Sequence, residues 1–126
     1  MSGEKILITE DERITALDLK MTLEKLGYLV VGSVASGEES IEYARRLKPD
    51  LVLMDIQMPE MDGYEATERI RSKGIATPIY ALSANVMKNE IETASNAGLD
   101  GYLTKPLEID ELVSCLQRFL IAGSRI

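Results

Sequence analysis

The chain has 126 residues, the size of one ordinary domain with a single core, and its 45% of hydrophobic residues exclude a disordered protein. Its formal net charge of −7 argues against duplex DNA or an anionic membrane surface as the direct partner. Because it has one cysteine, Cys115, and no histidine, an internal disulfide and a zinc site of cysteine and histidine are both excluded.

The first residues lack the long apolar stretch of a secretory signal, and no run approaches the roughly 18 apolar residues of a membrane-spanning helix. With a single cysteine, this favours a reducing, cytoplasmic compartment. We expect one domain over residues 1–126, with a core over about 5–120 and a tail or linker remnant at 121–126.

Short apolar runs alternate with longer amphipathic ones five times along the chain. In chain order, this pattern predicts a strand at 5–9, a helix at 13–26, a strand at 29–32, a helix at 37–47, a strand at 50–54, a helix at 64–71, a strand at 78–82, a helix at 86–97, a strand at 102–103 and a helix at 109–120. Two of these helices are followed by glycines, Gly27 and Gly98, which commonly end helices.

The predicted strands show no polar alternation and each is followed by a helix, which indicates a parallel sheet covered on both faces. Right-handed crossovers then give an α/β fold with a five-stranded, parallel, doubly wound sheet. The run at 50–54 is the most apolar and is expected at the centre of the sheet. A ligand site in such a fold lies at the carboxyl ends of the strands.

Polar residues follow four of the predicted strands at this edge: Glu10, Asp11, Asp55, Ser83 and Lys105. Crowded carboxylates repel each other, so a cation is expected among them, and oxygen ligands select Mg²⁺ or Mn²⁺. Asp11 and Asp55 would bind the cation directly, and Glu10 would act through water. An aspartate can also be a nucleophile that forms an acyl phosphate, with the metal, a lysine and a hydroxyl neutralising the transferred group.

Each of these residues has a plainer interpretation. Glu10 and Asp11 taken alone are most simply an acidic cap at the start of a helix. Asp55 taken alone could be a loop residue, and Lys105 a solvated charge. Their joint placement at the strand ends favours the functional interpretation.

Four segments of the sequence resemble the receiver domains of response regulators. They are Ile8 to Glu12 (ITEDE), Leu53 to Gly63 (LMDIQMPEMDG), Ala81 to Ala84 (ALSA) and Gly101 to Pro106 (GYLTKP). The resemblance spans about residues 5–120, and its later part is similar to the receivers fused to hybrid histidine kinases. It implies a flavodoxin-like (βα)5 fold.

The resemblance implies that Asp55 accepts a phosphoryl group from a histidine kinase or a histidine phosphotransfer domain. Glu10 and Asp11 would build the Mg²⁺ site with Asp55, and the backbone carbonyl of Gln57 would complete it. The pair Glu10-Asp11 departs from the commoner Asp-Asp, a change that a water-mediated ligand tolerates.

The resemblance also implies a switch. Ser83 would follow the phosphate and Lys105 would pair with it, while Tyr102 would swing inward when Ser83 moves. Ser83 stands where threonine is frequent and keeps the hydroxyl. The Lys105–Pro106 peptide bond would be cis. The helices at 86–97 and 109–120 would flank Tyr102 and form the surface that reads out phosphorylation.

The first predicted helix carries two apolar stripes. The core stripe is Ala16, Leu19, Leu23 and Leu26, and the opposite stripe is Ile14, Leu17 and Met21. The second stripe is either a set of ordinary exposed apolar residues or a docking patch for a helical partner beside Asp55. In related receivers this helix meets the kinase or phosphotransfer bundle. Cys115 is expected to be a buried, unreactive side chain.

Three other functions are weighed. An aspartyl-phosphate hydrolase of haloacid-dehalogenase type would have an aspartate where Gln57 stands and would need room for a cap. A nucleotide-binding module would have a glycine-rich phosphate loop after the first strand. A degenerate receiver that only binds partners is disfavoured by the intact set of polar residues.

We therefore expect a receiver that is not a separate enzyme and acts only on its own phosphorylation and dephosphorylation. We expect no direct nucleic-acid partner and no membrane contact. The sequence leaves open a dimer formed on phosphorylation. It also leaves open whether the chain stands alone or is excised from a hybrid kinase.

Overall fold

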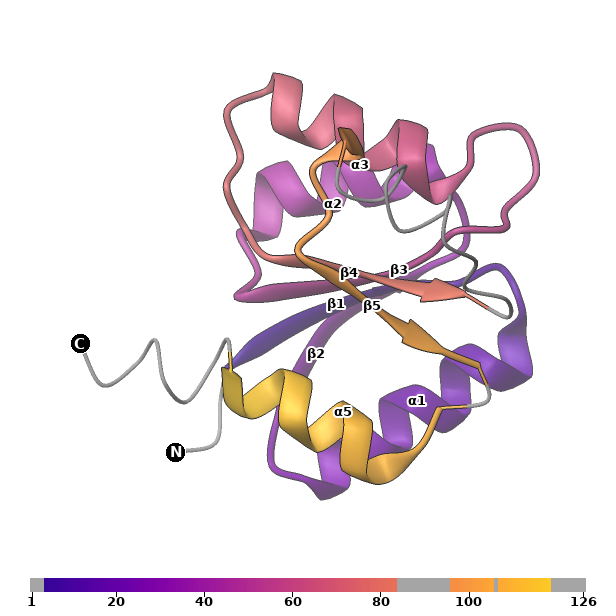
Figure 1. Cartoon of the computed structure of the whole chain (residues 1–126), viewed down its shortest axis with the longest axis vertical. Coiled ribbons are helices and arrows are strands. Elements are labelled where there is room, and N and C mark those ends of the chain that lie inside the picture. Colours follow the sequence, from indigo (N-terminus) through magenta and orange to yellow (C-terminus); the bar gives the residue numbers. More distant parts are fainter. Residues whose placement is uncertain (1–3, 84–95, 106, 119–126) are drawn as a thin grey trace.

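The computed structural model of the protein describes residues 4–83, 96–105 and 107–118. Five parallel strands form one sheet in the order β2-β1-β3-β4-β5 (Figure 1). The strands are β1 (Lys5–Thr9), β2 (Leu29–Val34), β3 (Leu51–Asp55), β4 (Ile79–Ser83) and β5 (Gly101–Thr104). The predicted fold class is confirmed, and β3 lies at the centre of the sheet with all its residues buried.

Helices cover both faces of the sheet, as the alternating pattern predicts. The described helices are α1 (Arg13–Lys25), α2 (Gly37–Leu47), α3 (Gly63–Ser72) and α5 (Ile109–Leu116). Figure 1 shows α1 and α5 on one face and α2 and α3 on the other. Most of the helix predicted at 86–97 and the predicted cis bond between Lys105 and Pro106 lie outside the described residues. Each described helix is too short or too polar to span a lipid bilayer.

Two hydrophobic clusters, one on each face, hold the layers together. Along β1, Leu7 belongs to the cluster under α2 and α3, whereas Ile6 and Ile8 belong to the cluster under α1 and α5. Successive side chains of a strand point to opposite faces, so an unbroken apolar run fills both clusters. Cys115 lies in the second cluster with Leu112 and Leu116, which confirms its predicted burial.

Some predicted boundaries are wrong by one or two residues. Strand β2 continues past the predicted end at 32 to Val34, because Val34 pairs with Thr9 and its carbonyl accepts the N–H of Glu10. Strands β3 and β4 each end one residue later than predicted, so Asp55 and Ser83 are their last residues.

The predicted place of Leu26 in the core stripe of α1 is wrong. The helix ends at Lys25, and Leu26 is its C-cap with 41% of its surface exposed. The N–H groups of Leu26, Gly27 and Tyr28 all bond back to carbonyls of the last turns, and Gly27 has a positive φ of 98°. This turn carries Leu26 away from the sheet, while Leu23, one turn earlier, is fully buried.

Helix α3 begins directly against the strand that ends in Asp55. Asp62 caps the helix by accepting the N–H of Glu65 at 2.9 Å. The N–H of Gly63 donates to the carbonyl of Ile56, and a Cβ at position 63 would lie 2.6 Å from the backbone oxygen of Asp55. Only glycine fits at this point, so the loop after β3 is tightly fixed.

A second close approach links β4 and β5. The ring of Tyr80 lies over Gly101, where an added Cβ would meet the Cζ atom at 2.5 Å. The Tyr80 hydroxyl accepts a hydrogen bond from Arg118 of the segment after α5, at 3.3 Å. Tyr80 therefore fills the space that a side chain at position 101 would need.

One side chain joins the segments at the amino-terminal ends of β4 and β5. The guanidinium of Arg71, in α3, donates to the carbonyls of Gly98, Ile75 and Thr77 at 3.1, 2.9 and 2.8 Å. It also pairs with Asp100 at 2.9 Å. We call this set of contacts the Arg71 clasp.

Candidate functional site

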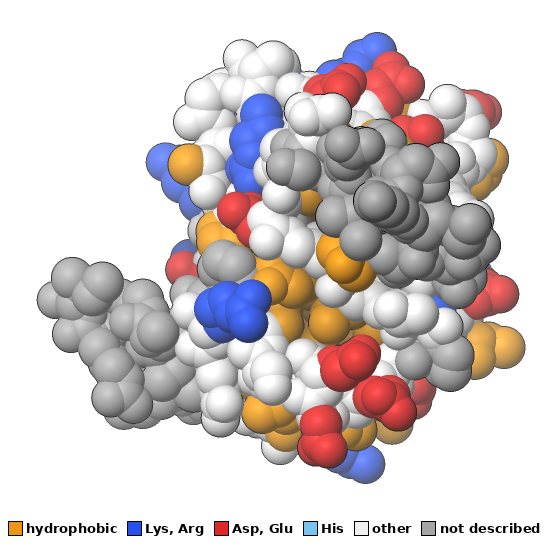
Figure 2. Space-filling view, viewed as in Figure 1, with side chains coloured by type: hydrophobic (Ala, Val, Ile, Leu, Met, Phe, Trp, Pro, Cys, Tyr) orange, Lys and Arg blue, Asp and Glu red, His pale blue; other side chains and the backbone are white. Residues whose placement is uncertain are grey.

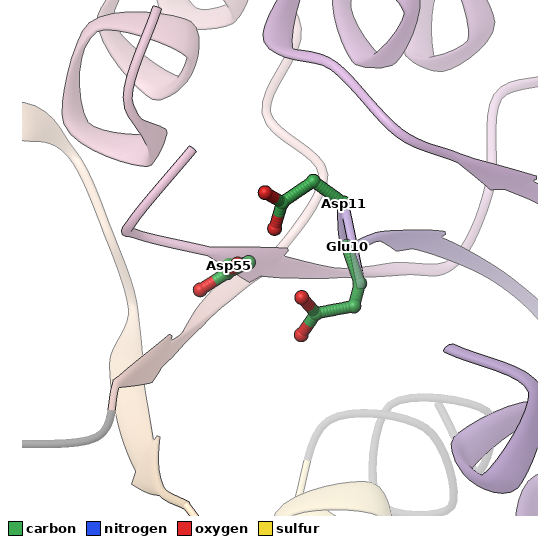
Figure 3. Close-up of side chains that lie close together, drawn as sticks. All are labelled: Glu10, Asp11 and Asp55. Atoms are coloured by element: carbon green, nitrogen blue, oxygen red, sulfur yellow. The ribbon is translucent and has the colours of Figure 1, made fainter. Parts of the chain in front are cut away.

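Three carboxylates meet at the carboxyl ends of β1 and β3, which are neighbours in the sheet. Oxygens of Glu10, Asp11 and Asp55 all lie within 4.8 Å of one another. Figure 3 shows the three side chains converging on a common space. Glu10 and Asp55 are each 3% exposed and Asp11 is exposed. The structure thus brings together the carboxylates that the sequence places far apart.

Backbone N–H groups fix two of these carboxylates. Glu10 accepts the N–H of Glu12 through Oε2 at 3.1 Å, and Asp55 accepts the N–H of Gln57 through Oδ1 at 3.2 Å. The N-cap of α1 is Glu12, whose side chain makes no capping hydrogen bond within the described part of the chain. Glu10 and Asp11 therefore do not act as the cap that is their plainer interpretation.

Lys105 reaches the same pocket from the residue after β5. Its Nζ lies 2.6 Å from Oε1 of Glu10 and 3.3 Å from Oδ1 of Asp55. Burial lowers the pKa of Lys105, but the bond to Glu10 and the charge of Asp55 outweigh it, so the pKa is raised. Lys105 is therefore a full cation shared by two buried carboxylates.

The pocket holds more negative than positive charge. Burial, followed by the hydrogen bond and charge of Glu10, raises the pKa of Asp55 from 3.8 to about 7, although Lys105 opposes the shift. Within the described residues, three carboxylates thus face one ammonium. A divalent cation with oxygen ligands would relieve this imbalance, so the residues present fit a Mg²⁺ site.

The remaining predicted residues lie at or near the same edge of the sheet. Ser83, 5% exposed, ends β4, and its carbonyl accepts the N–H of Lys105 at 2.8 Å. The backbone of Gln57 lies beside Asp55, and its side chain is exposed. Tyr102, on β5, pairs with Ala81 in the register and is 38% exposed. It borders a surface hollow with Tyr80 and Arg118.

The predicted second stripe of α1 is exposed. Ile14, Leu17 and Met21 expose 83%, 57% and 51% of their surfaces. Figure 2 shows apolar side chains standing out over the beginning of α1. Leu17 also lines a hollow with Glu10 and Asp11, so the stripe adjoins the carboxylates.

One exposed residue of this surface was not predicted from the sequence. Ile109, at the start of α5, is 53% exposed and lines a groove with Ile14 and Leu107. Ile109 has the spacing from Leu112 and Leu116 that members of a core stripe have, so the helical pattern did not indicate its exposure. Its place in the first turn of α5 is the signal that could have found it. We call Ile14, Leu17, Met21 and Ile109 the α1 patch.

Cys115 takes no part in the site. It is buried, and burial raises the pKa of its thiol to about 12. The thiolate, which is the reactive form, is therefore scarce at neutral pH, in line with the predicted lack of reactivity.

Comparison with known proteins identifies the family. The sequence profile of the response regulator receiver domain matches residues 6–117. Transcriptional regulatory protein PdtaR of Mycobacterium tuberculosis (strain ATCC 25618 / H37Rv) is 42% identical over 113 residues, which are 90% of this chain and 55% of that protein. Two-component response regulator ORR41 of Oryza sativa subsp. japonica is 38% identical over 121 residues, 94% of this chain and 95% of that one.

Solved structures agree with these relatives. The receiver domain of sensor histidine kinase PA1611 from Pseudomonas aeruginosa PAO1, with magnesium coordinated in its active site cleft, is 38% identical, with a TM-score of 0.84 over 94% of this chain and 98% of that one. Chemotaxis protein CheY4 of Vibrio cholerae is 28% identical, with a TM-score of 0.88 over 94% of this chain and 100% of that one. The chain spans about half the length of PdtaR. It belongs to the response regulator receiver domain family and is a receiver domain of a two-component system.

Proposed function

We propose that this receiver is phosphorylated on Asp55. The observation that carries the proposal is the convergence of Glu10, Asp11, Asp55 and Lys105 at one edge of the sheet. Asp55 is the carboxylate of this set that ends the central strand, and its raised pKa is typical of a functional carboxylate. The match to the receiver family supports the same residue.

The cation we propose is Mg²⁺, with Mn²⁺ as a substitute. Asp11, Asp55 and the backbone carbonyl of Gln57 would hold it, and it would neutralise the oxygens of the transferred phosphoryl group. The structure of the PA1611 receiver has a magnesium ion coordinated in its active site cleft, which supports this choice. Glu10, whose Oε1 pairs with Lys105 and whose Oε2 accepts the N–H of Glu12, would act on the cation through water.

The side chains of this chain would act together on the phosphoryl group. A bond forms between phosphorus and a carboxylate oxygen of Asp55 as the bond from phosphorus to the donor's imidazole nitrogen breaks. Lys105 would place its ammonium beside the new group, and the hydroxyl of Ser83 would donate to one of its oxygens. The receiver is not a member of a separate family of catalytic enzymes, and the chemistry proposed is confined to its own aspartate.

Phosphorylation would be read out through Ser83 and Tyr102. Ser83 lies at the edge of the sheet where the new group would form, and Tyr102 is on the neighbouring strand. At 38% exposure, Tyr102 can still bury more of its ring. Movement of Ser83 toward the phosphate would open space for that ring, changing the surface around β5 and α5. A dimer formed on phosphorylation would use this surface.

The donor we propose is a histidine kinase or a histidine phosphotransfer domain, docked on the α1 patch. The patch lies beside Asp11 and Glu10 and presents apolar side chains at helical spacing, as a helical partner requires. The negative net charge supports a protein partner over nucleic acid or a membrane. A cytoplasmic location is part of this proposal.

Phosphorylation is tested with acetyl phosphate and Mg²⁺, followed by intact-protein mass measurement. We expect the gain of one phosphoryl group, which is lost in Asp55→Asn and when Mg²⁺ is removed. Asp50→Asn is the matched control, since this exposed aspartate precedes β3 and so lies at the opposite end of the strand from Asp55. Equal phosphorylation of Asp55→Asn and Asp50→Asn would contradict the proposal.

A further inference from the structure

We propose that exposed glutamates around the Asp55 pocket select a phosphoryl donor that is carried on a basic protein surface, and disfavour small anionic donors. We call these residues the glutamate rim, and they are Glu12, Glu38, Glu60 and Glu108. The rim binds neither the cation nor the phosphoryl group and acts through its charge alone. The inference rests on the proposed function and deepens it, because it names the charge that the donor's surface must have.

The rim residues stand just beyond the carboxyl ends of the strands. Within five residues of the end of β1, β2, β3 and β5, respectively, the chain places Glu12, Glu38, Glu60 and Glu108. Because the carboxyl ends of parallel strands meet at one edge, these glutamates are distributed around the edge that holds Asp55. All four side chains are exposed.

Two of the rim residues begin helices without capping them. Glu12 and Glu108 are the N-cap residues of α1 and α5, yet neither side chain makes a capping hydrogen bond in the part of the chain that the structure describes. The carboxylate of Glu12 accepts the hydroxyl of Thr15, which is a neutral donor. Their charges are therefore not balanced by the helices that they begin.

The other two rim residues are also uninvolved in capping. At the start of α2, Glu39 accepts the N–H of Ala35 and thereby supports the cap, while Glu38 lies beside it in the first turn. Glu60 lies in the loop before Asp62, which caps α3. Among the described residues, no rim glutamate forms an ion pair. The four charges are thus available to act on the space above the pocket.

Positive charge gathers at the opposite edge of the sheet. Exposed cations occupy the last turns or C-caps of α1, α2 and α3, and they are Lys25, Arg45, Arg46, Lys48 and Lys73. Figure 2 shows acidic side chains grouped over α5. At the carboxyl edge, the exposed Arg13 opposes the rim but is outnumbered by its glutamates. The surface around the pocket is therefore the acidic end of a polarised molecule.

This distribution of charge acts on a donor before contact. Like charges around a pocket repel an incoming anion, and a complementary surface is attracted and steered. Lys105 does not offset the repulsion at a distance, because its side chain is 22% exposed and it is shared by Glu10 and Asp55. A phosphohistidine flanked by lysine or arginine side chains would place those cations on the rim while its phosphoryl group enters the pocket.

The first test measures the second-order rate constant of phosphorylation by acetyl phosphate, a free anionic donor, at saturating Mg²⁺. We expect wild type to react about fivefold faster when the salt concentration rises from about 10 mM to about 300 mM, because salt screens the repulsion. A rate constant that is unchanged or falls with salt would overturn the inference.

A rim variant with Glu38→Gln, Glu60→Gln and Glu108→Gln in one chain tests the residues themselves. At low salt it should react with acetyl phosphate about fivefold faster than wild type. The matched control carries the same change at exposed glutamates farther along α1, α2 and α3, which are Glu24, Glu42 and Glu68. A rim variant no faster than this control would overturn the inference, and the salt dependence of wild type remains decisive if the rim variant does not fold.

The second test compares two synthetic phosphohistidine peptides as donors, one with lysines and one with glutamates beside the histidine. The lysine peptide should transfer to wild type about tenfold faster at low salt, and the rim variant should reduce this ratio to about threefold or less. Equal rates to wild type would overturn the inference. If wild type accepts no phosphoryl group from any donor, the proposed function fails. If Asp55 is phosphorylated at rates indifferent to salt and to the charge of the peptide, only this inference fails.

Discussion

The two edges of the sheet each hold a partly buried cation, but its partners differ between them. At the amino-terminal edge, the guanidinium of Arg71 meets one carboxylate, Asp100, and three backbone carbonyls. At the carboxyl edge, the ammonium of Lys105 is shared by two of three clustered carboxylates. The first edge is electrostatically satisfied and the second is not. Both edges contain charged groups, but only the carboxyl edge has more carboxylates than cations. An excess of one charge, and not the presence of charge, therefore indicates the functional site.

The largest expected effect is at the satisfied edge. Arg71→Met keeps the aliphatic stem but removes the shared donor of three carbonyls and the ion-pair partner of Asp100, which keeps only the N–H of Ile79. This should cost about 3 kcal/mol of unfolding free energy in urea titrations. Arg69→Met is the control, because its exposed pair with Glu65 should contribute only about 0.5 kcal/mol. Equal losses in the two variants would remove the basis of the comparison.

At the carboxyl edge, removal of a charge should raise the free energy of unfolding instead of lowering it. Because the pKa of Asp55 is raised from 3.8 to about 7, folding favours its protonated form. This contribution to stability is complete below pH 3.8 and is lost as the pH rises through about 7. Asp55→Asn should therefore stabilise the metal-free protein by about 2 kcal/mol at pH 8 and by little at pH 4.

Thermal unfolding at both pH values with EDTA checks this prediction. Mg²⁺ added at pH 8 should raise the melting temperature of wild type and have little effect on Asp55→Asn. Loss of stability in Asp55→Asn at pH 8 would show that the carboxylate is compensated in the fold. The carboxyl edge would then resemble the Arg71 clasp.

Two exposed leucines extend the comparison to the surface. Leu17 is 57% exposed near the carboxyl edge, and Leu29 is 51% exposed at the amino-terminal end of β2. Leu17→Glu should slow phosphotransfer from the cognate histidine donor about tenfold, equivalent to about 1.4 kcal/mol, by placing a charge in the docking surface. Leu29→Glu should leave the rate unchanged. Transfer is followed by loss of label from the donor, and equal rates in the two variants would refute the α1 patch as the docking surface.

The smallest expected effect concerns Thr9, which directly precedes Glu10. Its hydroxyl is fully buried and has no hydrogen-bond partner among the residues that the structure describes, which makes it another unsatisfied group at the carboxyl edge. Thr9→Val keeps the shape of the side chain and should raise the unfolding free energy by about 1 kcal/mol. The analogous Thr67→Val should destabilise, because the Thr67 hydroxyl donates to the carbonyl of Gly63 at 2.7 Å. Urea titration of both variants measures the two signs.

Sequence reasoning predicted the elements that topology and periodicity determine. Parallel strands bring their carboxyl ends together, so the convergence of Glu10, Asp55 and Lys105 followed from their places after strands. The burial of Leu23 and the exposure of Leu17 followed from helical spacing. These are properties of local pattern and chain connection.

Other features depend on contacts that no local pattern contains. Arg71 and Asp100 are distant in sequence, and nothing near either residue indicates their pairing. Leu26 and Ile109 lie at helix ends, where the turn of the backbone decides exposure and periodicity is a poor guide. The contact between Glu10 and Lys105 was missed for the same reason as the Arg71 pair, because the two residues are far apart in the sequence.

The contact between Tyr80 and Gly101 has a consequence for how such a chain can vary. A Cβ at position 101 would meet the Tyr80 ring at 2.5 Å, so any other residue there requires the ring to move or to be replaced. Loss of the ring would also remove the hydrogen-bond acceptor of Arg118. Positions 80, 101 and 118 should thus change as a linked group among close relatives, with a large aromatic at position 80 accompanying glycine at position 101. Substitutions at this edge of the sheet, next to the proposed switch residue Tyr102, would then be correlated among relatives.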